Sequence, residues 1–361
     1  MTDFKFNKVV VKIGSNVLTN ADGNIDQQAM ARLADQMSFI KKEGVEIVLV
    51  SSGAVASGRA MVSLIDKSDS ISSRQVFAAV GQVKLMQNYY ELFHNNNISC
   101  AQVLVTKEDF RDRVHYLNMR NCFNSLLQNN ILPIVNENDV ISVTELMFTD
   151  NDELAGLIAT MIGAEALVIL SNVDGIFDGN PKDKASKIIS KVDEKMDFSK
   201  YVHSTKSDFG RGGMITKSNI ARKVASSGIT VKISNGKKEN VLMELLSDNE
   251  FKVGTTFLPS KIVSGAKKQI SFAETFAKGE ITINQGAKDA LLSDRANSLL
   301  TVGIVNINGE FQTGDIVKIV DENKNVIGLG KVQYNSKKAY ELIGVKNQKA
   351  IIHYDYLYLN T

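Results

Sequence analysis

Two acids and an amide stand together at the start of an apolar helical pattern. Asp150, Asn151 and Asp152 lie in the run FTDNDELAGLIATMIGA, directly before apolar residues at helical spacing. The first turn of a helix exposes N–H groups that lack intrahelical partners, and side chains placed there are held at a fixed position. One interpretation is ordinary N-capping, for which Asp and Asn are common. The alternative is a polar binding site carried on a rigid helix.

A second polar cluster follows the apolar run ILPIV. Asn136, Glu137, Asn138 and Asp139 come one after another there. A turn would account for Asn and Asp at this point. A recognition loop would instead use the four side chains to bind an amino group or to orient water. Both interpretations fit the run taken by itself.

Two lysines accompany glycine-containing loops. Lys12 ends the run KVVVKI and is followed closely by Gly14 and Ser15, and Lys217 follows the loop GRGGM. Ser52 lies in a third loop of this kind, SSGA, after the run VLV. Glycine lets backbone N–H groups approach an anion closely, and a lysine adds charge. The alternative for Lys12 is a strand-end side chain that points to water. Neither lysine loop has the spacing of a Walker loop or of the G-x-G-x-x-G fingerprint.

Together these residues favour phosphoryl transfer. That chemistry depends on positioning and on neutralising charge, for which lysines, glycine loops and a cluster of acids are suited. Acyl transfer would call for an activated nucleophile, and the sequence offers no candidate triad. We expect the site at the carboxyl ends of parallel strands, where ligands of open α/β sheets bind.

The elements that position these residues alternate between short β-branched runs and helical patterns. We predict strands at 8–13, 45–50, 101–106, 131–136, 166–171 and 230–235. We predict helices from Asp26 to about Gly44 and at 74–93, 116–128, 153–162 and 217–227. Such alternation is typical of a three-layer α/β/α domain with a mostly parallel sheet.

The pattern changes after residue 259. Short strands separated by glycines follow, with one short helix at 286–292, which predicts a small β-rich module. The length of 361 residues also exceeds the usual size of one domain. We therefore expect two domains, at 1–259 and 260–361.

Composition excludes several kinds of function. The formal net charge is +2, and residues 260–361 carry 13 Lys and Arg against 10 Asp and Glu, so RNA is not the expected partner. The four histidines have no metal-ligand spacing, and we predict no protein-bound metal site.

The expected compartment is the cytoplasm. Cys100 and Cys122 lie within regular apolar patterns, which indicates buried, reduced thiols. No apolar run approaches membrane-spanning length, and the first residues lack the apolar core of a signal peptide. We expect no membrane partner.

Six motifs in this order resemble the amino acid kinase family: VVVKIGSNVL, VLVSSGAVASGR, AAVGQVKLM, ILPIVNENDVIS, FTDNDELAGLIA and GRGGMITK. The INEND and TDND pair is similar to the members that phosphorylate glutamate. Downstream, GEITINQGAKDALL and SLLTVGIVNINGEFQTGDIV resemble the PUA module that follows the kinase domain in many of them. The resemblance covers nearly the whole chain and implies an amino acid kinase fold followed by a PUA domain.

The resemblance also implies roles for individual residues. Lys12 and Lys217 would contact the ATP phosphates and the transferred phosphoryl group, and Asp152 would hold both lysines in place. The implied glutamate-binding residues are Ser52, Asp139 and Asn151, with Asn136 and Asp150 nearby. Besides the two lysines, the implied ATP-binding residues are Gly14, Ser15, Ser171, Asn172, Arg211, Gly212, Gly213 and Met214.

The implied reaction is ATP-dependent phosphorylation of the γ-carboxylate of L-glutamate, the first step of proline biosynthesis. Because that carboxylate is already a nucleophile, no general base is required. The resemblance implies ATP with Mg²⁺ on its phosphates, proline as a feedback inhibitor and a homo-oligomer, either a dimer or a tetramer. It also makes glutamyl phosphate reductase a candidate protein partner.

Two other functions are alternatives. The first is another kinase of the same fold, acting on aspartate, acetylglutamate, carbamate or uridylate. A nucleotide acceptor would call for a basic pocket, whereas INEND and TDND supply acids and amides, which favours an amino acid. The second alternative is RNA binding through the C-terminal module.

Overall fold

The structure is a computed structural model of the chain. It describes residues 4–64, 70–142, 148, 150–180, 183, 185–193, 196, 214–247, 253–260, 270, 277–293 and 297–359. The chain divides into two compact units, of which the first holds residues 1–109 and 116–261 and the second holds 262–361 with the short stretch 110–115. The domain boundary expected at residue 259 stays a prediction.

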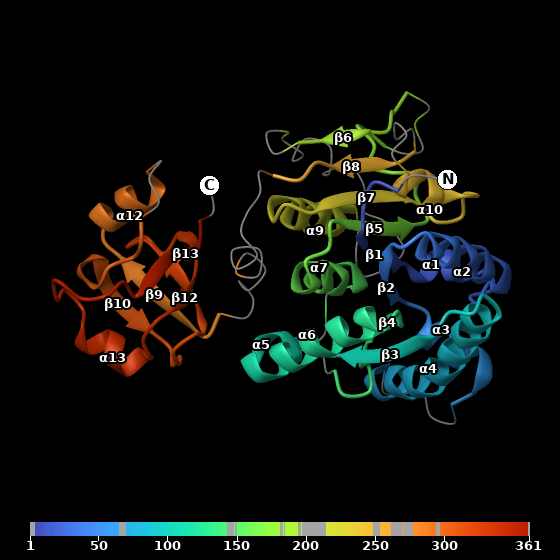
Figure 1. Cartoon of the computed structure of the whole chain (residues 1–361), viewed down its shortest axis with the longest axis horizontal. Coiled ribbons are helices and arrows are strands. Elements are labelled where there is room, and N and C mark those ends of the chain that lie inside the picture. Colours follow the sequence, from blue (N-terminus) through green and yellow to red (C-terminus); the bar gives the residue numbers. More distant parts are fainter. Residues whose placement is uncertain are drawn as a thin grey trace. The chain divides into compact units, whose positions relative to one another are not determined.

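The first unit is built around one sheet whose strand order is β3-β4-β2-β1-β5-β7-β8-β6 (Figure 1). Its strands are β1 (Lys8–Ile13), β2 (Glu46–Ser51), β3 (Cys100–Val105), β4 (Leu132–Glu137), β5 (Ala166–Ser171), β6 (Lys191–Val192), β7 (Thr230–Asn235) and β8 (Thr255–Phe257). Of the neighbouring pairs, β7 and β8 are antiparallel and the others are parallel. The six predicted strands and the mostly parallel sheet are confirmed.

Helices cover both faces of this sheet. They are α1 (Ser15–Leu18), α2 (Gln27–Lys42), α3 (Ala54–Met61), α4 (Ser70–Asn95), α5 (Lys107–Arg111), α6 (Arg113–Gln128), α7 (Asn151–Ile162), α9 (Met214–Ser226) and α10 (Val241–Leu246). The five predicted helices are confirmed as α2, α4, α6, α7 and α9, and the last four begin two to four residues earlier than predicted. The three-layer fold is therefore confirmed.

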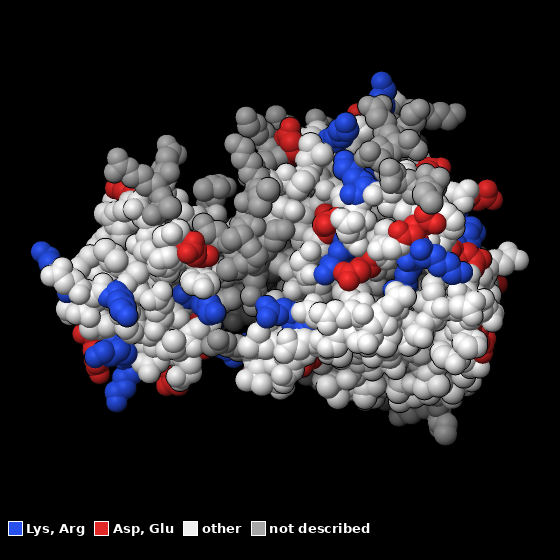
Figure 2. Space-filling view, viewed as in Figure 1, with Lys and Arg blue, Asp and Glu red and all other residues white. Residues whose placement is uncertain are grey.

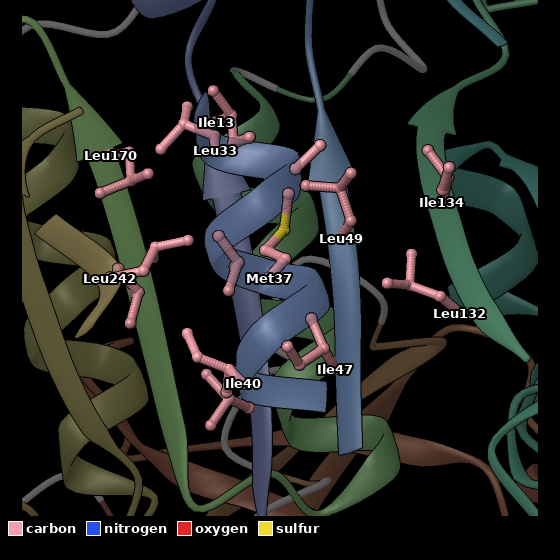
Figure 3. Packing of buried hydrophobic residues seen from close by; sticks show 14 of the residues in the cluster. Ile13, Leu33, Met37, Ile40, Ile47, Leu49, Leu132, Ile134, Leu170 and Leu242 are labelled. Carbon is pink, nitrogen blue, oxygen red and sulfur yellow. The ribbon is translucent and has the colours of Figure 1, made fainter. Parts of the chain in front are cut away.

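One core cluster shows how the layers are held together. In Figure 3, Leu33 of α2 lies beside Ile13, Met37 beside Leu49 and Ile40 near Ile47, and all six are fully buried. Because side chains alternate along a strand, the intervening residues face the opposite side. There, α7 packs against β1, β2, β4 and β5. Burial on both faces makes this sheet a rigid support for the residues at its carboxyl edge.

The two cysteines differ from expectation in one respect. Both are free thiols, but Cys122 is exposed on α6 and Cys100 is only partly buried. The prediction that both are buried is wrong, because Cys100 starts β3, which is an edge strand of the sheet.

Among the described residues, no helix combines the length and apolar character needed to span a membrane.

The second unit is β-rich, as predicted. Its sheet has the order β10-β9-β11-β12-β13. The elements are β9 (Gly279–Ile283), α12 (Gln285–Leu292), the 3-10 turn η2 (Thr301–Gly303), β10 (Ile304–Asn308), β11 (Ile316–Val320), β12 (Val326–Val332), α13 (Ser336–Glu341) and β13 (Ile352–Leu359). Phe311, Ile281 and Ile319 are among its buried core residues. On the face shown in Figure 2, its basic side chains stand among acidic and uncharged ones.

Candidate active site

A buried carboxylate shared by two lysines forms the centre of the site. Asp152 is fully buried in the first turn of α7, and its Oδ1 lies 2.6 Å from Lys12 Nζ at the end of β1. Its Oδ2 accepts a hydrogen bond from Lys217 Nζ in the first turn of α9. One carboxylate cannot neutralise two ammonium groups. Asp152 and the two lysines by themselves therefore carry a net positive charge, which suits phosphate oxygens, and the carboxyl of Asp150 lies near enough to interact with all three.

The ionisation of this carboxylate follows from its neighbours. Burial by itself raises the pKa of Asp152, but the charges of Lys12 and Lys217 and their hydrogen bonds act in the opposite direction and bring the pKa to about 2. The carboxylate is therefore charged at neutral pH. Its charge holds both lysines in place.

Asp150 begins the helix that carries Asp152. Its Oδ1 accepts hydrogen bonds from the backbone N–H groups of Asp152 and Glu153, at 2.9 and 3.1 Å, so the capping interpretation is confirmed. Its Oδ2 is buried and has no hydrogen-bond partner among the described residues. Burial and the charge of Asp152 raise the pKa of Asp150. Capping thus uses only one of the two carboxylate oxygens of Asp150.

A chain of amides lies beside this helix start. Asn151 Nδ2 donates to Ser52 Oγ at 2.9 Å and to Asn136 Oδ1 at 3.0 Å. Asn136 Nδ2 in turn donates to Gln82 Oε1 at 3.0 Å. This chain of hydrogen bonds connects α7 with α4. It passes through β4 and also reaches Ser52 in the loop that follows β2. Three residues predicted to bind the acceptor are thus in direct contact, while their roles stay predictions.

The remaining acids of INEND are held in two ways. Asp139 Oδ1 accepts from Arg74 of α4, at 2.7 Å from Nη2 and 3.2 Å from Nε. Glu137 Oε1 accepts from the backbone N–H of Phe148 at 3.0 Å, and burial raises the pKa of Glu137. Glu137 thereby ties the end of β4 to the segment before α7. Turn formation alone does not describe this loop, because its side chains bond to other elements.

The residues predicted near the nucleotide collect around the ends of β1 and β5. Gly14 N donates to Leu170 O at 3.1 Å, next to Ser171 and Asn172. A Cβ at Gly14 would lie 3.3 Å from that oxygen and 3.4 Å from Lys12 Nζ, so a larger residue there would crowd both groups.

The other predicted nucleotide residues divide into two groups. Ser15 begins α1 directly after Gly14, and Met214 begins α9, three residues before Lys217. Arg211, Gly212 and Gly213 lie outside the residues that the structure describes. Their assignment to the nucleotide stays a prediction.

Sequence reasoning missed two residues of this site, Gln82 and Arg74. Both belong to α4, within and just before the motif AAVGQVKLM. The sequence did contain a signal, because polar residues recur along this helix at Arg74, Gln82 and Tyr89, with spacings of eight and seven. All three bond to strand ends or loops of the sheet, and Tyr89 Oη lies 2.8 Å from Ser51 Oγ. Such spacing returns to the same helix face.

Comparison with known proteins identifies the family. Residues 7–235 match the sequence profile of the amino acid kinase family, and residues 279–354 match that of the PUA domain. The chain belongs to the amino acid kinase family. Within that family it is 54% identical to the glutamate 5-kinase of Bacteroides thetaiotaomicron, over 98% of this chain and 99% of that relative. It is 48% identical to the glutamate 5-kinase of Chlorobaculum tepidum, over 98% of both chains.

A solved structure shows a more distant likeness. The carbamate kinase from Giardia lamblia is 20% identical, with a TM-score of 0.49, over 71% of this chain and 99% of that chain. The two glutamate 5-kinases are similar to this chain over both its kinase and its PUA parts.

Proposed function

We propose that this protein transfers the γ-phosphoryl group of ATP to the γ-carboxylate of L-glutamate, as the first step of proline biosynthesis. The observation that carries the proposal is the buried carboxylate of Asp152 held between Lys12 and Lys217, directly beside the amide of Asn151. The relatives named glutamate 5-kinase, at 54% and 48% identity over nearly the full chain, support the same reaction.

The site suits a carboxylate acceptor. A carboxylate oxygen needs no deprotonation before it attacks, so the protein has to align the reactants and stabilise charge. The ammonium groups of Lys12 and Lys217 would stabilise the charge that spreads over the phosphoryl oxygens. Asp152 would not contact the substrate, because both of its oxygens are taken by the lysines.

Kinases of this family use ATP and a divalent metal. The ammonium groups of the two lysines fit the phosphates of a nucleotide. Among the described residues, no three His, Cys, Asp or Glu side chains gather in a way that could hold a metal ion. We therefore propose Mg²⁺ held mainly by the ATP phosphates, where it would neutralise their charge.

The acceptor would bind on the other side of the helix start. Ser52, Asn136 and Asn151 supply neutral hydrogen-bonding groups, and Asp139 and Asp150 supply carboxylates for an ammonium group. A uridylate acceptor would bring a second phosphate against these carboxylates, which is unfavourable. An amino acid is the acceptor that this set of side chains fits best.

Proline shares the ammonium and α-carboxylate of glutamate but lacks the γ-carboxylate. We propose that it inhibits by occupying the same pocket, so that raising the glutamate concentration relieves inhibition. Assembly into a dimer or tetramer and contact with glutamyl phosphate reductase are proposals that rest on the family resemblance, and a cytoplasmic location is a proposal that rests on the composition of the sequence.

An ADP-release assay with four acceptors tests the proposed reaction. The purified protein with ATP and Mg²⁺ would be given glutamate, aspartate, acetylglutamate or UMP in parallel. We expect ADP release to depend on glutamate and to be at least about tenfold faster than with the other three at equal concentration, because a polar site rejects acceptors that leave its groups unpaired. Preference for any other acceptor would contradict the proposal.

A further inference from the structure

Helix α4 bonds to the ends of two strands beside the proposed acceptor site. Tyr89 Oη lies 2.8 Å from Ser51 Oγ at the end of β2, and Gln82 accepts from Asn136 at the end of β4. Farther along the helix, Arg74 binds Asp139. A helix held at three points along one face has little freedom to shift, so its side chains keep a fixed position relative to the loops.

A close approach between helices places Gln82. A Cβ on the preceding Gly81 would lie 1.8 Å from Ala54 O in α3, and a Cβ on Gly58 of α3 would lie 1.9 Å from Phe77 O in α4. The two backbones therefore meet where neither residue has a side chain. This contact fixes the distance between α3 and α4 next to Gln82.

The amide chain has a direction. Asn151 donates to Asn136, and Asn136 donates to Gln82 Oε1, so each amide oxygen of Asn136 and Gln82 is used as an acceptor. Gln82 Nε2 stands at the end of the chain, and it donates to none of the described residues. An amide NH₂ group carries two donors and no acceptor. The chain thus ends in donors that suit a carboxylate.

The position of Gln82 in the amide chain indicates which carboxylate it would bind. Asn151 is next in sequence to Asp152, which binds both lysines, whereas Gln82 is two hydrogen bonds away from Asn151 along the chain. The γ-carboxylate of the acceptor must be at the lysine end. The opposite end of the acceptor carries the α-carboxylate.

We propose that Gln82 is a specificity-determining residue that donates hydrogen bonds from Nε2 to the α-carboxylate of the acceptor, while its Oε1 orients Asn136. This inference rests on the proposed glutamate phosphorylation. It assigns to α4 a part in acceptor recognition that INEND and TDND alone do not supply.

The test compares Gln82→Met and Gln82→Glu with the matched control Gln87→Leu, in the full-length protein. Gln87 lies on the same helix but is exposed and bonds to Glu91 at 2.9 Å. Gln82→Met preserves the length of the side chain. Gln82→Glu keeps the acceptor for Asn136 and removes the donors. Kinetics of ADP release would give kcat, KM for glutamate and KM for ATP.

We expect both Gln82 variants to raise KM for glutamate about tenfold or more, since each loses a hydrogen bond to a charged group, and to leave KM for ATP within about twofold. Two competitive inhibitors locate the effect. The Ki of glutarate, which keeps both carboxylates, should rise with KM, whereas the Ki of 4-aminobutyrate, which lacks the α-carboxylate, should stay unchanged. Gln87→Leu should behave as the wild type.

Other outcomes would overturn the proposal in distinguishable ways. If KM for glutamate is unchanged in either Gln82 variant, or if both inhibitors weaken equally, Gln82 does not bind the α-carboxylate. Wild-type protein that phosphorylates glutamate in the same experiment would leave the proposed function intact. Wild-type protein without glutamate-dependent ADP release would contradict both.

Discussion

Lys12 Nζ lies 2.6 Å from Asp152 Oδ1, and the two residues come from a central strand and from the first turn of a helix on the same sheet. The lysine side chain is 5% exposed and the aspartate side chain is fully buried. A buried pair of this kind costs free energy of desolvation and is weak evidence for stability by itself. Asp152 also binds Lys217 through its other oxygen. The arrangement of the three residues is therefore better explained by the two positive charges that Asp152 holds in place.

Removing either lysine should lower turnover. We expect Lys12→Ala and Lys217→Ala each to reduce kcat by about 10²–10³, the usual cost of removing one preorganised electrostatic group. Steady-state kinetics on folded protein, verified by circular dichroism, would measure this. Lys107→Ala is the matched control, because Lys107 of α5 also forms an ion pair with α7, at 3.3 Å from Glu153, but lies outside the proposed site. Near-normal kcat in a folded Lys12 or Lys217 variant would contradict the assignment.

The acceptor side should respond differently from the lysines. Asp139→Ala and Asn151→Ala should mainly raise KM for glutamate and leave KM for ATP within about threefold, since they are assigned to acceptor binding. Initial rates measured across both substrates separate the two constants. If these variants instead raise KM for ATP, the acceptor and nucleotide sides have been exchanged.

The contact between α3 and α4 should be sensitive to one methyl group. Gly81→Ala would place a carbon 1.8 Å from Ala54 O, so the helices must separate. We expect a loss of about 1–3 kcal/mol in the free energy of unfolding, as for other overpacked sites, and a higher KM for glutamate. Gly286→Ala is the control, because its added carbon would meet Asn284 Oδ1 only at 3.6 Å. Equal stability of the two variants in urea unfolding would refute the predicted clash.

The buried carboxyl of Glu137 predicts a pH dependence of stability. Burial raises its folded-state pKa above the ordinary value of 4.5, so its contribution to stability is fully present below that value and is lost as pH rises through the folded pKa. Glu137→Gln keeps an oxygen that can accept from Phe148 N and does not titrate. Its free energy of unfolding should therefore improve relative to the wild type as pH rises from 4 toward 7. A difference that does not vary with pH would count against a raised pKa.

Sequence patterns predicted the supporting elements well. The runs that became β1, β2 and β5 are continuous and β-branched because both faces of the sheet are covered. The starts of α4 and α9 were predicted too late. The first turn of α4, for example, contains Ser72 and Ser73, which do not continue the apolar pattern. The strands β6 and β8 have two and three residues, too few to show a period.

The predicted candidate residues lie at strand ends and helix starts, where polar residues interrupt apolar runs. Asp152 and Lys12 were predicted to be partners, and the structure places them in contact. Gln82 and Arg74 could not be predicted in the same way. Their contacts depend on how α4 is seated against α3 and the loops after β2 and β4, and that is a tertiary relationship that local pattern does not contain.

Oxygen-isotope transfer is the most direct test of the central claim that glutamate's own γ-carboxylate is the nucleophile. Glutamate labelled with ¹⁸O in both oxygens of the γ-carboxylate would be incubated with ATP, Mg²⁺ and the protein. The acyl phosphate would then be left to cyclise by attack of its amino group on the acyl carbon that carries the phosphate. Because that attack breaks the bond between carbon and the bridging oxygen, the released phosphate must carry one ¹⁸O atom per molecule. Phosphate that contains no ¹⁸O would show that ATP is hydrolysed by water and would contradict the proposed function.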